Sequence, residues 1–96
     1  MTTQEIVKFL RDKKVFLQEK FSVKEIGLFG SYAKKQETKD SDIDIYVIYK
    51  QKNLDNMTGL WLYLEEVFNK KVDLFHYHDR LRKGLKEQIE KEVIYA

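Results

Sequence analysis

Apolar residues recur every three or four positions in three parts of the chain, and each part predicts a helix that packs on a core. The first part begins with Thr2 and Glu5, which have the spacing of a capping box. The third repeats leucine and isoleucine at four-residue steps. The predicted helices cover residues 2–20, 57–69 and 80–91, with Asp55 or Asn56 as the cap of the second and Asp79 as the cap of the third.

Shorter apolar stretches lie between the helical patterns and predict strands. The first predicted strand runs into a glycine, and a short helix and a polar turn separate it from the second. The order is therefore helix, strand, short helix, strand, helix, strand, helix, which predicts an α/β domain with helices packed on a small mixed β-sheet. The predicted strands cover residues 23–29, 43–49, 71–77 and 93–95; the short helix covers 31–36 and the turn 38–41.

Composition limits the class of protein without naming its chemistry. A chain of 96 residues, 43% of them hydrophobic, is the size of one globular domain, here residues 1–96. The 18 basic and 16 acidic side chains nearly balance, so no nucleic-acid partner is expected. The chain has no cysteine, no apolar run long enough for a membrane span and no secretory leader pattern, so we expect a cytoplasmic protein.

Two aspartates, Asp42 and Asp44, stand two positions apart at the start of the second predicted strand. They share one face of it, because Ile43, Ile45 and Val47 alternate with them onto the other face. Their Cα atoms would lie about 7 Å apart along the strand. Two such carboxylates repel each other unless a cation neutralises them, and an oxygen-only site suits Mg²⁺.

A Gly-Ser step and a third aspartate are predicted to meet this pair. Gly30 and Ser31 follow the first strand, and ten residues separate Ser31 from Asp42. If the first two strands are antiparallel neighbours, and a helix makes a right-handed parallel crossover to the third, Asp73 arrives beside the pair. Three carboxylates would then face a turn whose backbone N–H groups can hold phosphate, an arrangement suited to metal-assisted phosphoryl chemistry.

The sequence of Gly30 and Ser31, ten residues, then Asp42-Ile43-Asp44, resembles the signature of the polymerase-β-like nucleotidyltransferase superfamily. The short length and the apolar pattern of the last helix and strand are similar to the MNT group, the minimal nucleotidyltransferases. With the order of helices and strands included, the resemblance covers nearly the whole chain. It implies the nucleotidyltransferase fold.

The resemblance also implies a reaction, which is the transfer of AMP from ATP to a hydroxyl with pyrophosphate leaving. Members of the group commonly pair with a HEPN-domain toxin and act as antitoxins by AMPylating one of its tyrosines. Asp73 would also help to deprotonate the acceptor hydroxyl. The implied site residues are Gly30, Ser31 and Lys34 for the nucleotide, and Asp42, Asp44 and Asp73 as catalytic ligands of Mg²⁺, with two ions expected.

Several residues have a second interpretation. The family often has arginine and glycine where this chain has Lys34 and Lys35, so triphosphate affinity or loop geometry would differ. Ser31 could simply cap the short helix, and Asp73 could be an exposed strand residue. Tyr46 and three other aromatic residues of the strands could stack on a base or lie beneath a helix.

Two other functions are compatible with the same residues. One is a non-catalytic antitoxin that neutralises a HEPN protein by contact alone. The other is a small-molecule nucleotidyltransferase, which usually needs a further domain for its acceptor. A homodimer is compatible with every reading.

Overall fold

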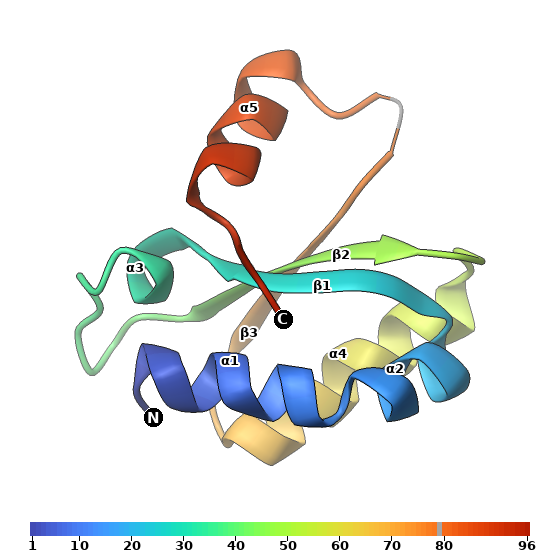
Figure 1. The fold of residues 1–96 in the computed structure, drawn as a ribbon, viewed down its shortest axis with the longest axis horizontal. Coiled ribbons are helices and arrows are strands. Elements are labelled where there is room, and N and C mark those ends of the chain that lie inside the picture. Colours follow the sequence, from blue (N-terminus) through green and yellow to red (C-terminus); the bar gives the residue numbers. More distant parts are fainter. Residues whose placement is uncertain (79) are drawn as a thin grey trace.

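The computed structural model describes residues 1–78 and 80–96. Its four strands are β1 (Val23–Phe29), β2 (Ile43–Tyr49), β3 (Val72–His76) and β4 (Ile94–Tyr95). They form one sheet in the order β3-β2-β1-β4. β1 is antiparallel to both β2 and β4, whereas β2 and β3 are parallel (Figure 1). The predicted mixed α/β sheet is therefore confirmed.

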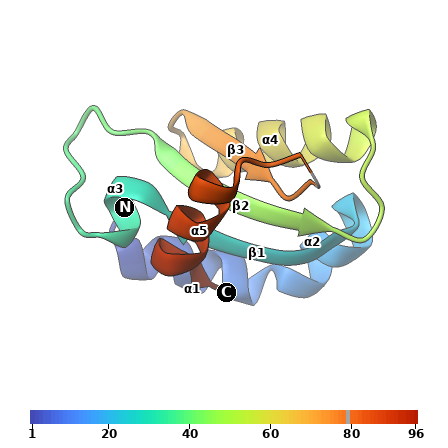
Figure 2. The same ribbon diagram turned by 90° about the horizontal axis from the view of Figure 1, so that it is seen from above.

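Helices cover the two faces of the sheet unequally. Helices α1, α2 and α4 lie along one face, and α5 crosses the other (Figures 1 and 2). The four-residue α3 follows β1 directly. None of the described helices is both long enough and apolar enough to span a membrane. The helices are α1 (Thr3–Asp12), α2 (Lys14–Phe21), α3 (Gly30–Ala33), α4 (Leu54–Phe68) and α5 (Lys83–Glu92).

The main core lies between the sheet and helices α1, α2 and α4. Ile43, Ile45 and Val47 of β2 are at most 1% exposed there, as their alternation predicts. Leu10 of α1 and Leu64 of α4 are fully buried against them. Because this face is closed by apolar packing, Asp44 of β2 is directed to the opposite face of the sheet.

A smaller core lies on that opposite face, under α5. Phe29, Tyr46 and Ile89 are buried in it, and Phe75 of β3 packs edge-on to Phe29 with ring centroids 5.1 Å apart. Tyr46 is only 1% exposed, so of the two predicted alternatives for this ring, burial beneath a helix is the observed one. Helix α5 thus covers the centre of this face.

The first predicted helix, residues 2–20, is wrong in one respect, because it is two helices. The chain leaves helical geometry at Lys13 (φ −98°, ψ 7°), where the N–H of Lys13 still bonds to the Phe9 oxygen (3.0 Å). Four charged residues in a row, 11–14, leave no apolar side chain to hold a straight helix against the sheet at this point. The apolar stripe continues in phase to Leu17, so periodicity alone could not reveal the break.

Other predicted boundaries shift by a few residues. Helix α4 is capped by Asn53, whose side chain accepts a bond from the Asn56 N–H (2.8 Å), and not by Asp55 or Asn56. Helix α5 begins at Lys83, three residues later than predicted, and Arg82 at its start makes no side-chain cap. Asp79, the predicted cap, lies outside the described residues.

We expect Gly27→Ala to detach β4 and to destabilise the domain by about 2 kcal/mol, since overpacking at a closed contact costs that much. A Cβ at Gly27 would lie 2.6 Å from Val93 Cγ2 and 2.9 Å from the Ile94 oxygen. Urea unfolding measures the loss. An unchanged unfolding midpoint would contradict the close packing of β4 on β1.

Candidate active site

The site begins at the end of β1, where the backbone turns at Gly30 and lies against the side chain of Asp44. Gly30 has a φ of +73°, a conformation that side chains other than glycine rarely adopt. A Cβ added there would overlap the Asp44 carboxylate, with Asp44 Cγ only 2.9 Å away. The β1–β2 register explains this contact, because Phe29 pairs with Asp44. Glycine is therefore required both by the backbone and by the aspartate.

Parallel pairing of β2 with β3 places Asp73 directly opposite Asp44. A bond from the Ile43 N–H to the Lys71 oxygen (3.0 Å) holds the two strand starts together. Asp42 precedes β2, beyond a turn closed by the Ser41 N–H bonding to the Thr38 oxygen (3.1 Å). The topology inferred from the sequence, an antiparallel β1–β2 pair and a parallel crossover, is confirmed.

The electrostatics of this edge centre on Asp44. Burial of Asp44, followed by the nearby carboxylates of Asp73 and Asp42, raises the pKa of Asp44 from an ordinary value of 3.8 to about 6. The ionised form of Asp44 is therefore disfavoured, both because its carboxylate is partly removed from water and because the neighbouring carboxylates repel it. A bound cation would relieve the repulsion, so the carboxylates have the chemistry of a cation site.

The donor set fits Mg²⁺, because all three side chains offer carboxylate oxygens. Within residues 1–78 and 80–96, no three acidic or histidine side chains lie close enough together to bind one metal ion as a group. The observed arrangement is a facing pair, Asp44 and Asp73, with Asp42 close enough to affect the pKa of Asp44. Which of them bind metal stays a prediction.

The residues predicted to hold phosphate are in helix α3 and at its end. Ser31 is half-buried as the second residue of α3, next to Gly30. Lys34 ends the helix, and its Nζ lies 2.9 Å from Glu92 Oε1 at the end of α5. This ion pair lowers the pKa of Glu92, mainly through the bond from Lys34. Sequence reasoning missed Glu92, because nothing in the spacing of residues so far apart indicates a contact.

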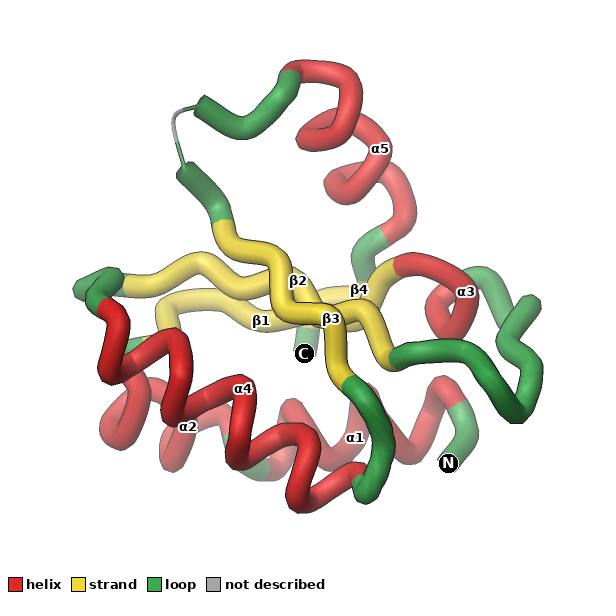
Figure 3. Tube along the Cα trace, turned by 180° about the vertical axis from the view of Figure 1, so that it is seen from behind, coloured by secondary structure: helices red, strands yellow, loops and turns green. Residues whose placement is uncertain are grey.

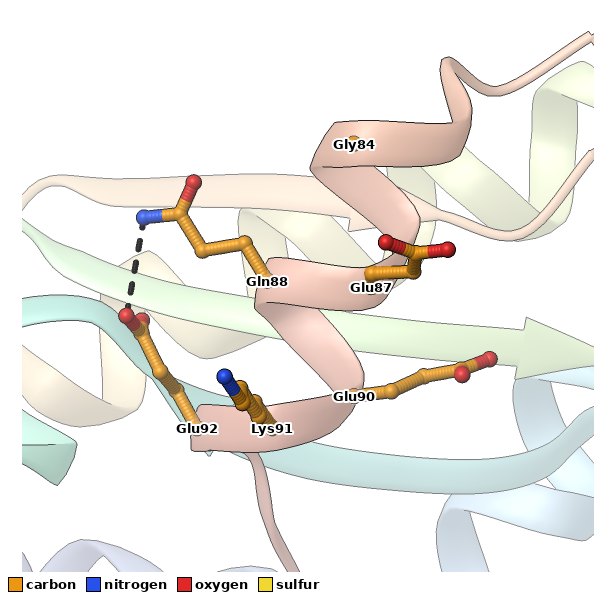
Figure 4. Close-up of a pocket in the computed structure, with 6 residues that line it drawn as sticks. All are labelled: Gly84, Glu87, Gln88, Glu90, Lys91 and Glu92. Carbon is orange, nitrogen blue, oxygen red and sulfur yellow. Dashed lines mark hydrogen bonds between the residues drawn. The ribbon is translucent and has the colours of Figure 1, made fainter.

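A hollow also lies on the outer side of α5 (Figure 4). It measures about 770 Å³ and is lined by six residues of that helix, without any of the predicted site residues. Gln88 donates a long bond to Glu92 (3.5 Å) across one turn there. This open hollow is the surface of a single amphipathic helix, and its lining includes no residue of the acidic edge, the sheet edge that carries Asp42, Asp44 and Asp73.

Comparison with known proteins identifies the family. A sequence model described as "Polymerase beta, Nucleotidyltransferase" matches residues 11–96 of the chain. This chain belongs to that nucleotidyltransferase family. The resemblance given by the Gly-Ser step and the paired aspartates is therefore confirmed, and the protein is a nucleotidyltransferase.

Relatives of this nucleotidyltransferase match along its whole length. "Protein adenylyltransferase MntA" of Thermococcus cleftensis is 36% identical over 97 residues, covering 100% of this chain and 97% of the relative. A solved structure named "Structure of putative minimal nucleotidyltransferase" is 27% identical with a TM-score of 0.77, covering 98% of this chain and 95% of the other. "Crystal structure of the toxin-antitoxin with AMP-PNP" is 25% identical with a TM-score of 0.69, covering 99% and 72%.

Proposed function

We propose that this nucleotidyltransferase transfers AMP from ATP to a tyrosine hydroxyl of a HEPN-domain toxin and so acts as an antitoxin. The observation that carries the proposal is the facing pair of Asp44 and Asp73 beside the turn at Gly30. The name of the Thermococcus relative and the nucleotide analogue in the toxin–antitoxin structure support it. The HEPN partner follows from the family resemblance of the sequence.

The turn at the end of β1 would bind the triphosphate. Gly30 has no side chain, so phosphate oxygens can approach the backbone closely, and the Ser31 hydroxyl can donate to one of them. Lys34 would exchange its partner Glu92 for a phosphate oxygen. Use of ATP as the substrate places the proposed reaction in the cytoplasm.

The acidic edge would carry out the transfer. Asp42, Asp44 and Asp73 would hold two Mg²⁺ ions, which neutralise triphosphate charge when bound. Asp73 would accept the proton of the acceptor hydroxyl. The deprotonated hydroxyl oxygen of the acceptor forms a bond to the α-phosphorus of ATP. The bond from the α-phosphorus to the oxygen that bridges it to the β-phosphorus breaks, and pyrophosphate leaves with that electron pair.

A toxicity assay separates this proposal from neutralisation by contact alone. The chain is expressed with a HEPN-domain toxin, as wild type or Asp73→Asn. We expect wild type to restore growth and to leave AMP on a toxin tyrosine, detected by mass spectrometry, and Asp73→Asn to do neither.

The matched control for this assay is Asp40→Asn, which removes an exposed acid before β2 and should behave as wild type. Full protection by Asp73→Asn, with no AMP on the toxin, would contradict catalysis and favour contact. AMP transfer to small hydroxyl compounds but never to the toxin would favour a small-molecule enzyme.

A further inference from the structure

The outer strand of the sheet next to the site, β3, has one side paired and one side open (Figure 3). Its pairing with β2 begins at the Lys71 oxygen and ends at the Tyr77 N–H, which bonds to the Val47 oxygen (3.0 Å). In a parallel ladder, alternate residues of one strand bond to the neighbour. The odd-numbered residues therefore face β2, and Val72, Leu74 and His76 direct their N–H and C=O groups outward.

Two side chains of helix α4 form hydrogen bonds with the backbone of Val72, the first of these outward residues. The Val72 N–H donates to Glu65 Oε2 (2.9 Å), and Trp61 Nε1 donates to the Val72 oxygen (3.0 Å). In the described part of the chain, no side-chain, turn or loop hydrogen bond reaches the backbone of Leu74 or His76. Two consecutive outward residues thus keep free backbone donors and acceptors.

These unpaired backbone groups lie on one edge of the sheet, that of β3. The other edge strand, β4, has only two residues, and shortness is a common protection against edge pairing. β3 has five residues, and Asp73 lies between the closed Val72 and the open Leu74. A hollow of about 350 Å³ follows the same edge, lined by Trp61 and residues 71–75. The free edge is therefore continuous with the acidic site.

We propose that an extended segment of the acceptor protein adds to the outer side of β3 as a further strand, bonded to the backbone of Leu74 and His76. The proposal rests on the proposed function and names where its acceptor binds. A peptide backbone supplies donors and acceptors at the repeat of about 7 Å that separates alternate strand residues. A residue of that segment opposite Asp73 would have its Cβ about 5 Å from that of Asp73, on the catalytic face.

Hydrogen exchange of single amides tests the docking directly. The chain is measured alone and saturated with the HEPN-domain toxin in the presence of Mg²⁺ and α,β-methylene-ATP, from which AMP cannot be transferred. The Leu74 and His76 amides should exchange at least about tenfold more slowly in the complex, because pairing protects them. The Phe75 amide, which faces β2, is the internal control and should not change.

Unchanged Leu74 and His76 amides in the saturated complex would overturn the proposal. Protection that appears without partner and grows with the concentration of this chain would also overturn it, since a second copy would then occupy the edge.

A proline substitution tests the same edge through kinetics. Leu74→Pro removes an outward N–H that the β2 ladder does not use, and proline is tolerated at such edge positions. Leu74→Ala loses the same packing but keeps the N–H, so it is the matched control. Relative to Leu74→Ala, the proline variant should raise the KM for the acceptor protein at least about tenfold, with equal affinity for ATP.

The two proposals fail in different ways. If wild type transfers no AMP, the proposed function fails. If wild type transfers AMP and folded Leu74→Pro has the KM of Leu74→Ala, only strand docking fails. If Leu74→Pro does not fold, the exchange experiment alone decides.

Discussion

Asp44→Asn should lower the rate of AMP transfer about a thousandfold and, without Mg²⁺, should make the protein more stable at neutral pH. Burial and the neighbouring acids raise the pKa of Asp44 to about 6 in the folded state, above its ordinary 3.8. The folded state therefore binds this proton more tightly than the unfolded state, so stability falls as pH rises through that interval. Asparagine has the same shape and no charge, which removes the penalty above pH 6.

The side chain is partly exposed, so water screens the repulsion, and we expect a gain of about 1 kcal/mol, or about 4 °C in Tm. Calorimetry at pH 7.5 and pH 3.5 measures it, and the difference should be confined to the higher pH. Transfer should fall on the order of a thousandfold, because asparagine would hold Mg²⁺ more weakly and the positive charge of the metal at the reacting phosphate would be lost.

Magnesium supplies a second measurement on the same pair of proteins. Mg²⁺ should raise the Tm of wild type and have a much smaller effect on Asp44→Asn, because a ligand that binds only the folded state stabilises it. Asp40→Asn should respond as wild type does. A less stable Asp44→Asn at pH 7.5 without Mg²⁺, or one that transfers AMP at the wild-type rate, would contradict the account of the acidic edge.

Gly30→Ala should damage the site and the fold together. The backbone at Gly30 has a φ of +73°, and the new methyl group would overlap the Asp44 carboxylate. We expect a loss of about 2 kcal/mol in stability from backbone strain and overpacking, and at least about a hundredfold loss in transfer. Urea unfolding and the transfer assay measure the two effects.

Gly84→Ala is the matched control for this change. Gly84 is helical, and apart from its chain neighbours and the backbone of its own helix no described atom lies within 4 Å of the place where its Cβ would be. Alanine there should raise stability by up to about 1 kcal/mol through helix propensity and leave transfer unchanged. Equal behaviour of the two alanine variants would show that the contact between Gly30 and Asp44 has no special role.

The strands and their connections could be predicted because local patterns encode them. The bounds of β1 and β2 match the predicted residues 23–29 and 43–49. Gly30 marks the end of β1, and the alternation of apolar and polar residues marks the extent of β2. The break at Lys13 could not be predicted, because the apolar stripe keeps its phase across it. Helix starts were also displaced, because Asn53 and its neighbours offer several equivalent caps.

The site was predictable to the level of which strand ends meet. The facing of Asp44 and Asp73 follows from a crossover helix and a parallel pair. The contact of Gly30 with Asp44 depends on the register of β1 and β2, which the spacing of residues along the chain does not give. The raised pKa of Asp44 likewise depends on its burial and its neighbours in the folded protein. The pairing of Lys34 with Glu92 and the open backbone of β3 depend on how helices lie on the sheet, which local pattern does not encode.

The most direct test uses ATP labelled at one phosphate at a time. The chain is incubated with Mg²⁺, a HEPN-domain toxin, and ATP labelled at either the α- or the γ-phosphate. The account predicts that the α label appears on a tyrosine of the partner and the γ label in free pyrophosphate. Label from the γ-phosphate on the partner, or no α label on it at all, would contradict adenylyl transfer at the acidic edge.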